Sequence, residues 1–313
     1  MTGMMRTGGF DGAEPVLPAP LEPRPGPVGA AEPVFTYSHA GQTRLRRRLI
    51  RLAEAAAGRN RLERLYQDWR ARPRPVREPV LTAAVRALGL WPQFLAGGYD
   101  RIPREGGLVI VANHPFGIVD GLILGHIACS VRPDVKLMVH SRLCQPPEVK
   151  DVLLPVDFGG GAEARRISAE TRRQAMDWVA AGHVLVIFPA GGVATAPKPL
   201  ARTAADAAWH PFVARLALVP GARVVPVFFH GRNSRLFQVA SHWSYPLRVA
   251  LIFRETLRRR GRAVPVSVGE AVACTGVPRA EVTAHLRRLT FALAGRRGPR
   301  AEEEFVFPAR IRW

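Results

Sequence analysis

Residues 109–121 read Val109-Ile-Val-Ala-Asn-His-Pro-Phe-Gly-Ile-Val-Asp-Gly121, and this stretch is the strongest signal in the chain. A short apolar strand leads directly into Asn113 and His114, and Asp120 follows six residues after the histidine. A histidine just past the carboxyl end of a strand is expected at the rim of an α/β sheet, where such folds bind their ligands. A carboxylate beside one ring nitrogen fixes the tautomer and leaves the other nitrogen free to accept a proton. Taken alone, the pattern fits a buried histidine that only satisfies a backbone carbonyl equally well.

Two further stretches support a functional site. Residues 184–195 read Val-Leu-Val-Ile-Phe-Pro-Ala-Gly-Gly-Val-Ala-Thr, and residues 224–234 read Val-Val-Pro-Val-Phe-Phe-His-Gly-Arg-Asn-Ser. Strand-then-His-(x5)-Asp, strand-then-Phe-Pro-x-Gly and strand-then-Pro-Val, in this order, resemble the glycerolipid (lysophospholipid) acyltransferase superfamily over roughly residues 90 to 270. The spellings Asn-His-Pro-Phe-Gly, Phe-Pro-Ala-Gly-Gly and His-Gly-Arg-Asn-Ser resemble one bacterial branch of it, described as haemolysin-like or as acyltransferases of phospholipid and ornithine-lipid synthesis.

The resemblance implies acyl transfer from a thioester of coenzyme A or acyl-carrier protein to a lysolipid hydroxyl, with no metal and no further cofactor. His114 is then the general base and Asp120 the group that orients its ring. The residue chemistry agrees, because an alcohol is a poor nucleophile at neutral pH and general-base help contributes roughly 10²–10⁴-fold. No Gly-x-Ser-x-Gly elbow is present, which agrees with direct attack by the acceptor. The resemblance implies that these residues contact substrate: Asn113, Gly117, Phe188, Pro189, Gly191, Gly192, Pro226 and Asn233.

The sequence departs from the wider superfamily in two places. Five residues instead of four separate His114 from Asp120, and on a helix start one extra residue rotates the carboxylate by about 100°. Pro115 and Gly117 predict an irregular turn that keeps the contact feasible. In the second motif the wider superfamily has Glu after Pro and then an Arg that grips the acceptor's phosphate, whereas this chain has Ala190 and, over 192–194, Gly-Val-Ala. We therefore expect other basic residues to bind an acidic head group: Lys198, Arg202 and Arg142.

Composition limits the class of partner. The chain has 313 residues, 47% hydrophobic residues and a formal net charge of +20. Its apolar runs are strand-length, short of the about 20 residues that span a bilayer, and we expect no secretory signal. Three cysteines without metal-ligand spacing favour a reducing cytoplasm. The charge predicts an anionic partner. Nucleic acid is disfavoured, since no interleaved aromatic or helix-turn-helix pattern occurs. We therefore expect peripheral binding to an anionic membrane surface, at the inner face of the cell membrane.

Alternating strand and helix patterns from residue 106 onward predict an α/β domain whose mostly parallel sheet is flanked by helices, with an N-terminal helical extension. The expected division is a disordered tail over 1–36, a basic helical extension over 37–95, the acyltransferase domain over 96–295 and a C-terminal tail over 296–313. Strands are predicted at 107–112, 135–139, 152–156, 184–188, 223–229, 247–253 and 264–268. Helices of the domain are predicted at 119–129, 162–181, 203–218 and 278–294.

In the basic extension we expect a helix over 43–57, whose helical pattern continues through 62–69, and a second helix over 80–90. The first has Thr43 as its cap and carries one apolar stripe, Leu45, Leu49, Leu52 and Ala56, with arginines off it. We expect the stripe to pack on the domain, as regular amphipathic helices usually do, while insertion into an anionic membrane is the alternative. The apolar end Leu88–Leu95 either packs on the domain or enters the membrane, and the sequence does not decide.

Two other functions stay open on sequence grounds. A catalytically silent lipid-binding relative is compatible with the missing phosphate-gripping residues, although His114 and Asp120 are both present. A lipid or thioester hydrolase would use the same histidine on water, which is a smaller version of the same nucleophile. Dependence of the reaction on an acceptor separates hydrolysis from transfer.

Overall fold

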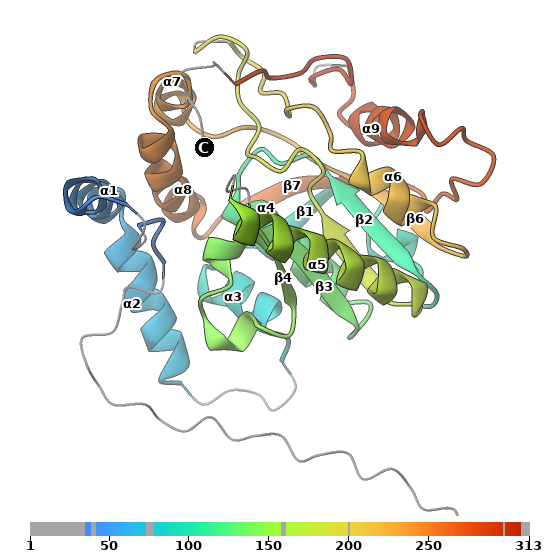
Figure 1. Cartoon of the computed structure of the whole chain (residues 1–313), viewed down its shortest axis with the longest axis horizontal. Coiled ribbons are helices and arrows are strands. Elements are labelled where there is room, and N and C mark those ends of the chain that lie inside the picture. The colour runs from blue at the N-terminus through green and yellow to red at the C-terminus, as the bar shows by residue number, and fades with distance from the viewer. Residues whose placement is uncertain are drawn as a thin grey trace, which may run out of the picture. The chain divides into compact units, whose positions relative to one another are not determined.

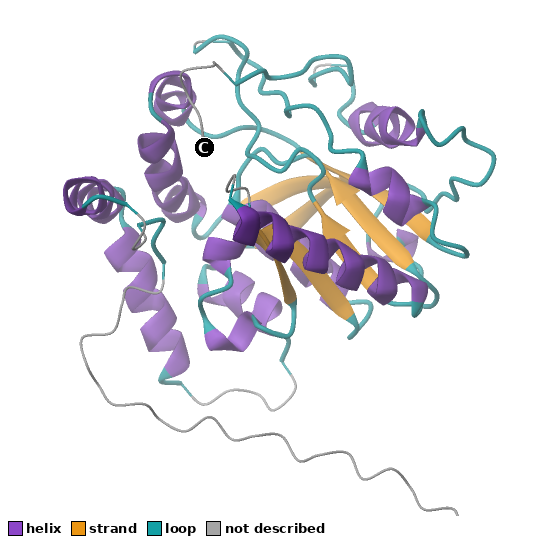
Figure 2. Cartoon of the chain, in the orientation of Figure 1, coloured by secondary structure: helices purple, strands orange, loops and turns teal. Residues whose placement is uncertain are grey.

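The computed structural model describes residues 35–38, 42–72, 78–157, 161–199, 201–296 and 298–307. All but the last two residues of the expected tail 1–36 lie outside these ranges, as do residues 308–313 of the C-terminal tail. In the described part, helices surround one central sheet (Figure 2). The predicted α/β class is confirmed.

The sheet of the described residues has seven strands in the order β1-β7-β6-β2-β5-β3-β4 (Figure 1). The neighbours β6 and β7 run antiparallel, and the other neighbouring pairs are parallel. Strand β2 lies between β5 and β6. After β2 the chain passes β5 to reach β3, whereas after β5 it passes β2 in the opposite direction to reach β6. Such a position is where open α/β sheets bind ligands. The strands are β1 Trp91–Ala96, β2 Leu108–Ala112, β3 Val135–His140, β4 Leu153–Val156, β5 Val184–Ile187, β6 Arg223–Phe229 and β7 Ala263–Val268.

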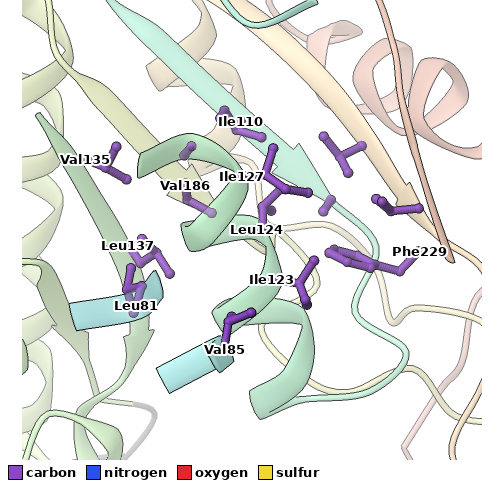
Figure 3. Close-up of a cluster of buried hydrophobic side chains, with 14 of the residues drawn as sticks. Leu81, Val85, Ile110, Ile123, Leu124, Ile127, Val135, Leu137, Val186 and Phe229 are labelled. Atoms are coloured by element: carbon purple, nitrogen blue, oxygen red, sulfur yellow. The ribbon is translucent and has the colours of Figure 1, made fainter. Parts of the chain in front are cut away.

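Two apolar layers enclose the sheet. On one face, Ile123 and Ile127 of α4 pack with Leu81 of α3 against Ile110 and Val186 of the strands (Figure 3). Helices α5, α6 and α9 cover the other face. Strands buried on both faces read as continuous apolar runs, which is why β2 and β5 were recognisable from sequence. The helices are α1 Arg44–Ala56, α2 Arg59–Arg70, α3 Val80–Ala87, α4 Ile118–Cys129, α5 Ala162–Ala180, α6 Phe212–Ala217, α7 Arg235–Trp243, α8 Tyr245–Arg259 and α9 Val282–Ala292.

The strand predicted at 247–253 was wrong, because these residues lie within helix α8. Its start is fixed by Ser244, whose hydroxyl accepts a hydrogen bond from the Leu247 N–H, and by Pro246 in the first turn. The segment is buried on most of its circumference, so it shows no 3.6-residue alternation. A short apolar run of this kind cannot be told from a buried strand by periodicity.

Three other segments differ from the predicted elements. The helix predicted at 203–218 is confined to α6, since residues 201–210 form an irregular loop. Helix α7 was not predicted. The helix predicted over 80–90 ends at Ala87, and the apolar end Leu88–Leu95 is only partly packed: β1 pairs in parallel with β7 and Leu88 and Leu90 are buried, whereas Trp91 and Leu95 are 50% and 54% exposed. The expected domain limits stay predictions, but β1 makes the segment before residue 96 part of the central sheet.

Helix α1 begins as predicted, with the Thr43 side chain accepting from the Arg46 N–H. The expectation that its leucine stripe packs on the domain was wrong. Leu45, Leu49 and Leu52 are 68%, 58% and 69% exposed, whereas the opposite side of the helix is buried, including Glu54. Glu54 accepts hydrogen bonds from the Thr36 hydroxyl and the Tyr37 N–H, so polar contacts decide which side of the helix faces inward.

Candidate functional site

His114 lies directly beyond the carboxyl end of β2, and its main chain is fixed on both sides. The Asn113 amide donates to the Phe229 carbonyl at 3.0 Å and accepts from the Phe229 N–H at 2.7 Å, which ties the end of β2 to the end of β6. The His114 carbonyl accepts from the Ala194 N–H at 2.7 Å. The histidine therefore projects from a backbone that the two neighbouring strand ends hold in place.

The predicted histidine–carboxylate contact is present. Nδ1 of His114 lies 3.1 Å from Oδ2 of Asp120. The same carboxylate oxygen accepts from the N–H groups of Phe116 and Gly117 at 2.7 and 3.0 Å. Gly117 has φ of +80°, a conformation that L side chains rarely adopt. This turn absorbs the additional residue between His114 and Asp120, so the longer spacing still places the carboxylate against the ring.

The burial of the His114–Asp120 pair changes the pKa of the carboxyl group and limits which part of the imidazole ring is accessible. Asp120 is fully buried, and burial raises the pKa of its carboxyl group, while His114 and the two N–H donors oppose that rise. Nδ1 of His114 is buried as well. The His114 side chain is 17% exposed and lines the cavity, so part of the ring other than Nδ1 is accessible. A base needs this arrangement: one nitrogen held by a carboxylate, the other open to a reactant.

A second buried carboxylate, that of Asp206, binds the main chain of the loop that carries His114. Its Oδ1 accepts from the His114 N–H at 3.1 Å, and its Oδ2 accepts from Nε1 of Trp209 at 3.0 Å. Arg287 of α9 lies close enough to act on it electrostatically, and burial raises the pKa of the Asp206 carboxyl. Sequence reasoning missed this residue, because it lies in a loop 92 residues downstream and no local motif marks it.

The Phe-Pro-Ala-Gly-Gly segment forms the neighbouring wall. The Phe188 ring lies against the His114 ring, with 4.2 Å between centroids. Gly191 has φ of +66°, and its N–H donates to the Phe188 carbonyl at 2.9 Å, which closes a tight turn after β5. The turn brings the second sequence motif to the first, as the resemblance implied.

A cavity of about 660 Å³ opens beside His114. Its size is in the range of small-molecule and lipid sites, and its walls are mostly apolar. Helix α2 contributes one wall through half-buried side chains, including Leu65 and Trp69, and Phe35 and Tyr37 contribute another. The following predicted site residues line the cavity: His114, Gly117, Phe188, Pro189, Gly191 and Gly192.

Six other predicted substrate-contacting residues do not line the cavity: Asn113, Arg142, Lys198, Arg202, Pro226 and Asn233. Asn113 is engaged with Phe229 as described above, and Pro226 is buried within β6. Lys198 and Arg202 are solvent-exposed. Whether Lys198, Arg202 or Arg142 binds an acidic head group stays a prediction, since none of the three lines the cavity. Two cations that sequence reasoning passed over do line the cavity, namely Arg172 and Arg248.

Comparison with known proteins gives the class. The model of the acyltransferase family matches residues 51–275. Since this region is more than half of the chain, the protein belongs to the acyltransferase family, a class of group-transfer enzymes. The resemblance to the glycerolipid acyltransferase superfamily is thereby confirmed.

Individual relatives are distant. A lyso-glycine lipid O-acyltransferase of Phocaeicola vulgatus is 22% identical over 182 residues, which cover 56% of this chain and 62% of the relative. A lyso-glycine lipid O-acyltransferase of Bacteroides thetaiotaomicron is 25% identical over 189 residues, covering 56% and 64%. The chain thus spans less than two thirds of either relative. The crystal structure of the 1-acyl-sn-glycerophosphate (LPA) acyltransferase PlsC from Thermotoga maritima aligns with a TM-score of 0.42 and 14% identity, over 80% of this chain and 95% of that chain.

Proposed function

We propose that the protein transfers a fatty acyl group from the thioester of acyl-CoA or acyl-carrier protein to the hydroxyl of a lysolipid. The observation that carries the proposal is the His114–Asp120 pair, in which Nδ1 of His114 is buried against the carboxylate while the His114 side chain lines a large apolar cavity. An apolar cavity suits a fatty acyl chain, and a histidine oriented by a carboxylate suits an alcohol nucleophile.

The reaction needs one proton carrier. Nε2 of His114 accepts the hydroxyl proton as the acceptor oxygen attacks the thioester carbonyl carbon. The resulting tetrahedral intermediate expels the thiolate, which takes the same proton back from the imidazolium. Asp120 keeps the ring in the tautomer with hydrogen on Nδ1 and stabilises the cation that forms in between. No acyl-enzyme is required, since the acceptor attacks directly.

The acceptor is a lysolipid in membrane-lipid biosynthesis. The names of the two relatives support a lyso-glycine lipid, and lysophosphatidic acid, another lysophospholipid or a lyso-ornithine lipid are the chemically related candidates. All share a free hydroxyl beside one acyl chain. The donor differs only in what carries the thioester, coenzyme A or acyl-carrier protein.

We further propose that the enzyme works peripherally on the cytoplasmic face of an anionic membrane. No helix of the described residues is both long and apolar enough to cross a bilayer. The support is α1, whose outward side exposes three leucines and whose sequence carries five arginines, Arg44, Arg46, Arg47, Arg48 and Arg51. A helix with an apolar stripe flanked by cations suits the interface of anionic lipid.

The deciding experiment incubates the purified protein with radiolabelled acyl-CoA or acyl-carrier protein and a panel of lysolipids, and identifies the products. Formation of a diacyl product with at least one acceptor, absent with His114→Ala, is the expected result. Release of free fatty acid without any acceptor would instead establish a hydrolase. Neither product, with lipid still bound, would establish a catalytically silent lipid-binding relative.

A further inference from the structure

The charged side chains of the cavity wall fall into two kinds. Among the described residues that line the cavity, the acidic side chain is Glu148 and the Lys and Arg side chains are Arg172 and Arg248. Glu148 forms an ion pair with Arg70 at 2.9 Å and accepts from the Tyr66 hydroxyl at 2.6 Å. Its charge is therefore already compensated inside the protein.

The Arg248 guanidinium also has its hydrogen-bond partners within the protein. It is almost completely buried, and its two terminal nitrogens donate to the Val193 carbonyl and the Thr195 hydroxyl. Its guanidinium also lies over the Phe237 ring, 5.0 Å from the centroid. These contacts stabilise the segment after the Phe-Pro-Ala-Gly-Gly turn, and they leave little of Arg248 to bind a ligand.

Arg172 is different. It is half-buried on α5, and its guanidinium stacks over the Phe212 ring, 6.0 Å from the centroid. Arg173, the next residue of the same helix, pairs with Glu170 and Asp177. Arg172 forms no such hydrogen bond or ion pair within the described residues. A guanidinium at an apolar wall without an anion is poorly compensated, so an anionic ligand would be stabilised there.

His210 supplies a neutral donor beside this cation. Its Nδ1 accepts from the Phe212 N–H at 3.1 Å, so in the neutral ring the hydrogen sits on Nε2. Partial burial and the nearby Arg172 charge lower the His210 pKa, which keeps the ring neutral. The His210 N–H donates to the Pro189 carbonyl at 2.9 Å. The pair is thereby attached to the turn whose Phe188 touches His114.

We infer that Arg172 and His210 form a binding subsite for the anionic group, carboxylate or phosphate, of a substrate that occupies the cavity. The inference rests on the proposed function for the identity of the substrate, which is an acidic lysolipid acceptor. A phosphate of the coenzyme A donor has the same chemistry and is the other source. The subsite takes the place that we expected Lys198, Arg202 and Arg142 to hold, and it explains how a chain without the Arg of the second motif selects an acidic acceptor.

The test measures equilibrium binding without turnover, so it does not depend on transfer being observed. Lysophosphatidic acid and a monoacylglycerol with the same acyl chain are titrated separately, below their micelle-forming concentrations, with tryptophan fluorescence as readout because Trp209 and Trp69 line the cavity. We expect the anionic lipid to bind more tightly than the neutral one. Arg172→Gln should remove that preference by weakening lysophosphatidic acid binding about 10- to 100-fold while monoacylglycerol binding stays unchanged. Arg172→Lys should restore part of it, and His210→Phe should cost a few-fold.

The matched control is Arg215→Gln. Arg215 also stacks on the Phe212 ring, at 5.9 Å, but it is exposed and does not line the cavity, so its loss should leave both affinities unchanged. A parallel titration with coenzyme A identifies the source of the anion: weakening of coenzyme A binding alone by Arg172→Gln would assign the subsite to the donor. An unchanged lipid preference in Arg172→Gln together with unchanged coenzyme A binding, or an equal loss for anionic and neutral lipid, would overturn the inference. Absence of transfer by the wild-type protein would refute the proposed function and leave this result standing.

Discussion

The part of the chain that the structure describes contains two histidine–aspartate pairs, one after the carboxyl end of a strand and one before the amino end of another. His114 follows β2 and lies 3.1 Å from Asp120, whereas His183 precedes β5 and lies 2.9 Å from Asp134. Asp120 is fully buried, with N–H groups as its other donors, and its pKa is raised by that burial. Asp134 is partly exposed; partial burial raises its pKa, but Arg132 and His183 outweigh this and hold the value below the ordinary range.

The difference shows that a short distance between the two side chains does not by itself mark a histidine–aspartate pair as a candidate catalytic pair. The carboxylate of Asp134 is neutralised by Arg132, which also donates to the carbonyls of Gly106 and Gly182, so this pair ties loops together. The carboxylate of Asp120 has the His114 ring as its polar side-chain partner, and the ring opens onto the cavity. Position at the carboxyl edge of the sheet, burial and access to a cavity distinguish the two.

The largest expected effect is a loss of kcat that distinguishes the His114–Asp120 pair from the His183–Asp134 pair. His114→Ala should lower kcat by about 10²–10⁴-fold or more, since the general base is removed. Asp120→Asn should also reduce kcat strongly, because it removes the charge that holds the ring. His183→Ala is the matched control and should change Tm rather than kcat. Steady-state acyl transfer with folded variants measures this, and equal losses for His114→Ala and His183→Ala would contradict the assignment.

The second prediction removes the carboxylate that accepts a hydrogen bond from the His114 main chain. Asp206→Asn should lower kcat by roughly 10²-fold with little change in acceptor KM, because an amide places an N–H₂ group against one of two donors and shifts His114. Steady-state kinetics measures the two constants. A KM increase with unchanged kcat would mean that Asp206 acts on binding and not on the orientation of His114.

The control for the Asp206→Asn variant is the dependence of its stability on pH. Burial raises the Asp206 pKa above the ordinary 3.8, so its contribution to folding is present below the ordinary value and is lost as pH rises through the raised pKa. Asparagine cannot ionise. The Tm difference, variant minus wild type, should therefore become more positive as pH increases from about 4.

A third prediction concerns the cavity, which His114 lines and His183 does not. Leu65→Trp enlarges a half-buried side chain of the α2 wall and should shift donor preference toward shorter acyl chains. Each excluded methylene is worth about 0.8 kcal/mol, or roughly fourfold in kcat/KM. Competition among acyl donors of graded length gives the measurement. Val306→Trp, at a position 81% exposed, is the control that should leave the length profile unchanged.

The smallest effect is expected outside the cavity, on α1. Replacing Leu45, Leu49 and Leu52 together by Ser should weaken binding to vesicles of anionic lipid without changing kcat on a dispersed substrate. The α1 arginines should make the binding sensitive to salt, at about 1 kcal/mol each near the surface. Vesicle sedimentation across a salt series measures both. Unchanged binding by the triple variant would exclude the leucine stripe as a membrane contact.

Much of the catalytic half of the structure was predictable because its signals are local. The apolar runs of β2 and β5 end in motifs, and the pleat and the turn after each strand bring those motifs to one edge of the sheet. Helix α8 was misread because residues 247–253, apart from Arg248, form a continuous apolar run that by itself resembles a buried strand, and the exposed stripe of α1 was misread because buried Glu54 reversed the expected face. Asp206 and Arg172 were missed because their roles depend on long-range packing that no spacing encodes.

The attachment of the C-terminal segment has a thermodynamic consequence. The Phe305 N–H donates to the Asp206 carbonyl at 2.9 Å, and Arg287 donates to the carbonyls of Ala301 and Glu303 at 2.6 and 2.9 Å. The residue that holds His114 is thus shared with the end of the described chain. We therefore expect a ligand that orders the histidine loop to slow hydrogen exchange at Phe305, and any such coupling is reciprocal. The C-terminal segment would then report occupancy of the cavity that His114 lines.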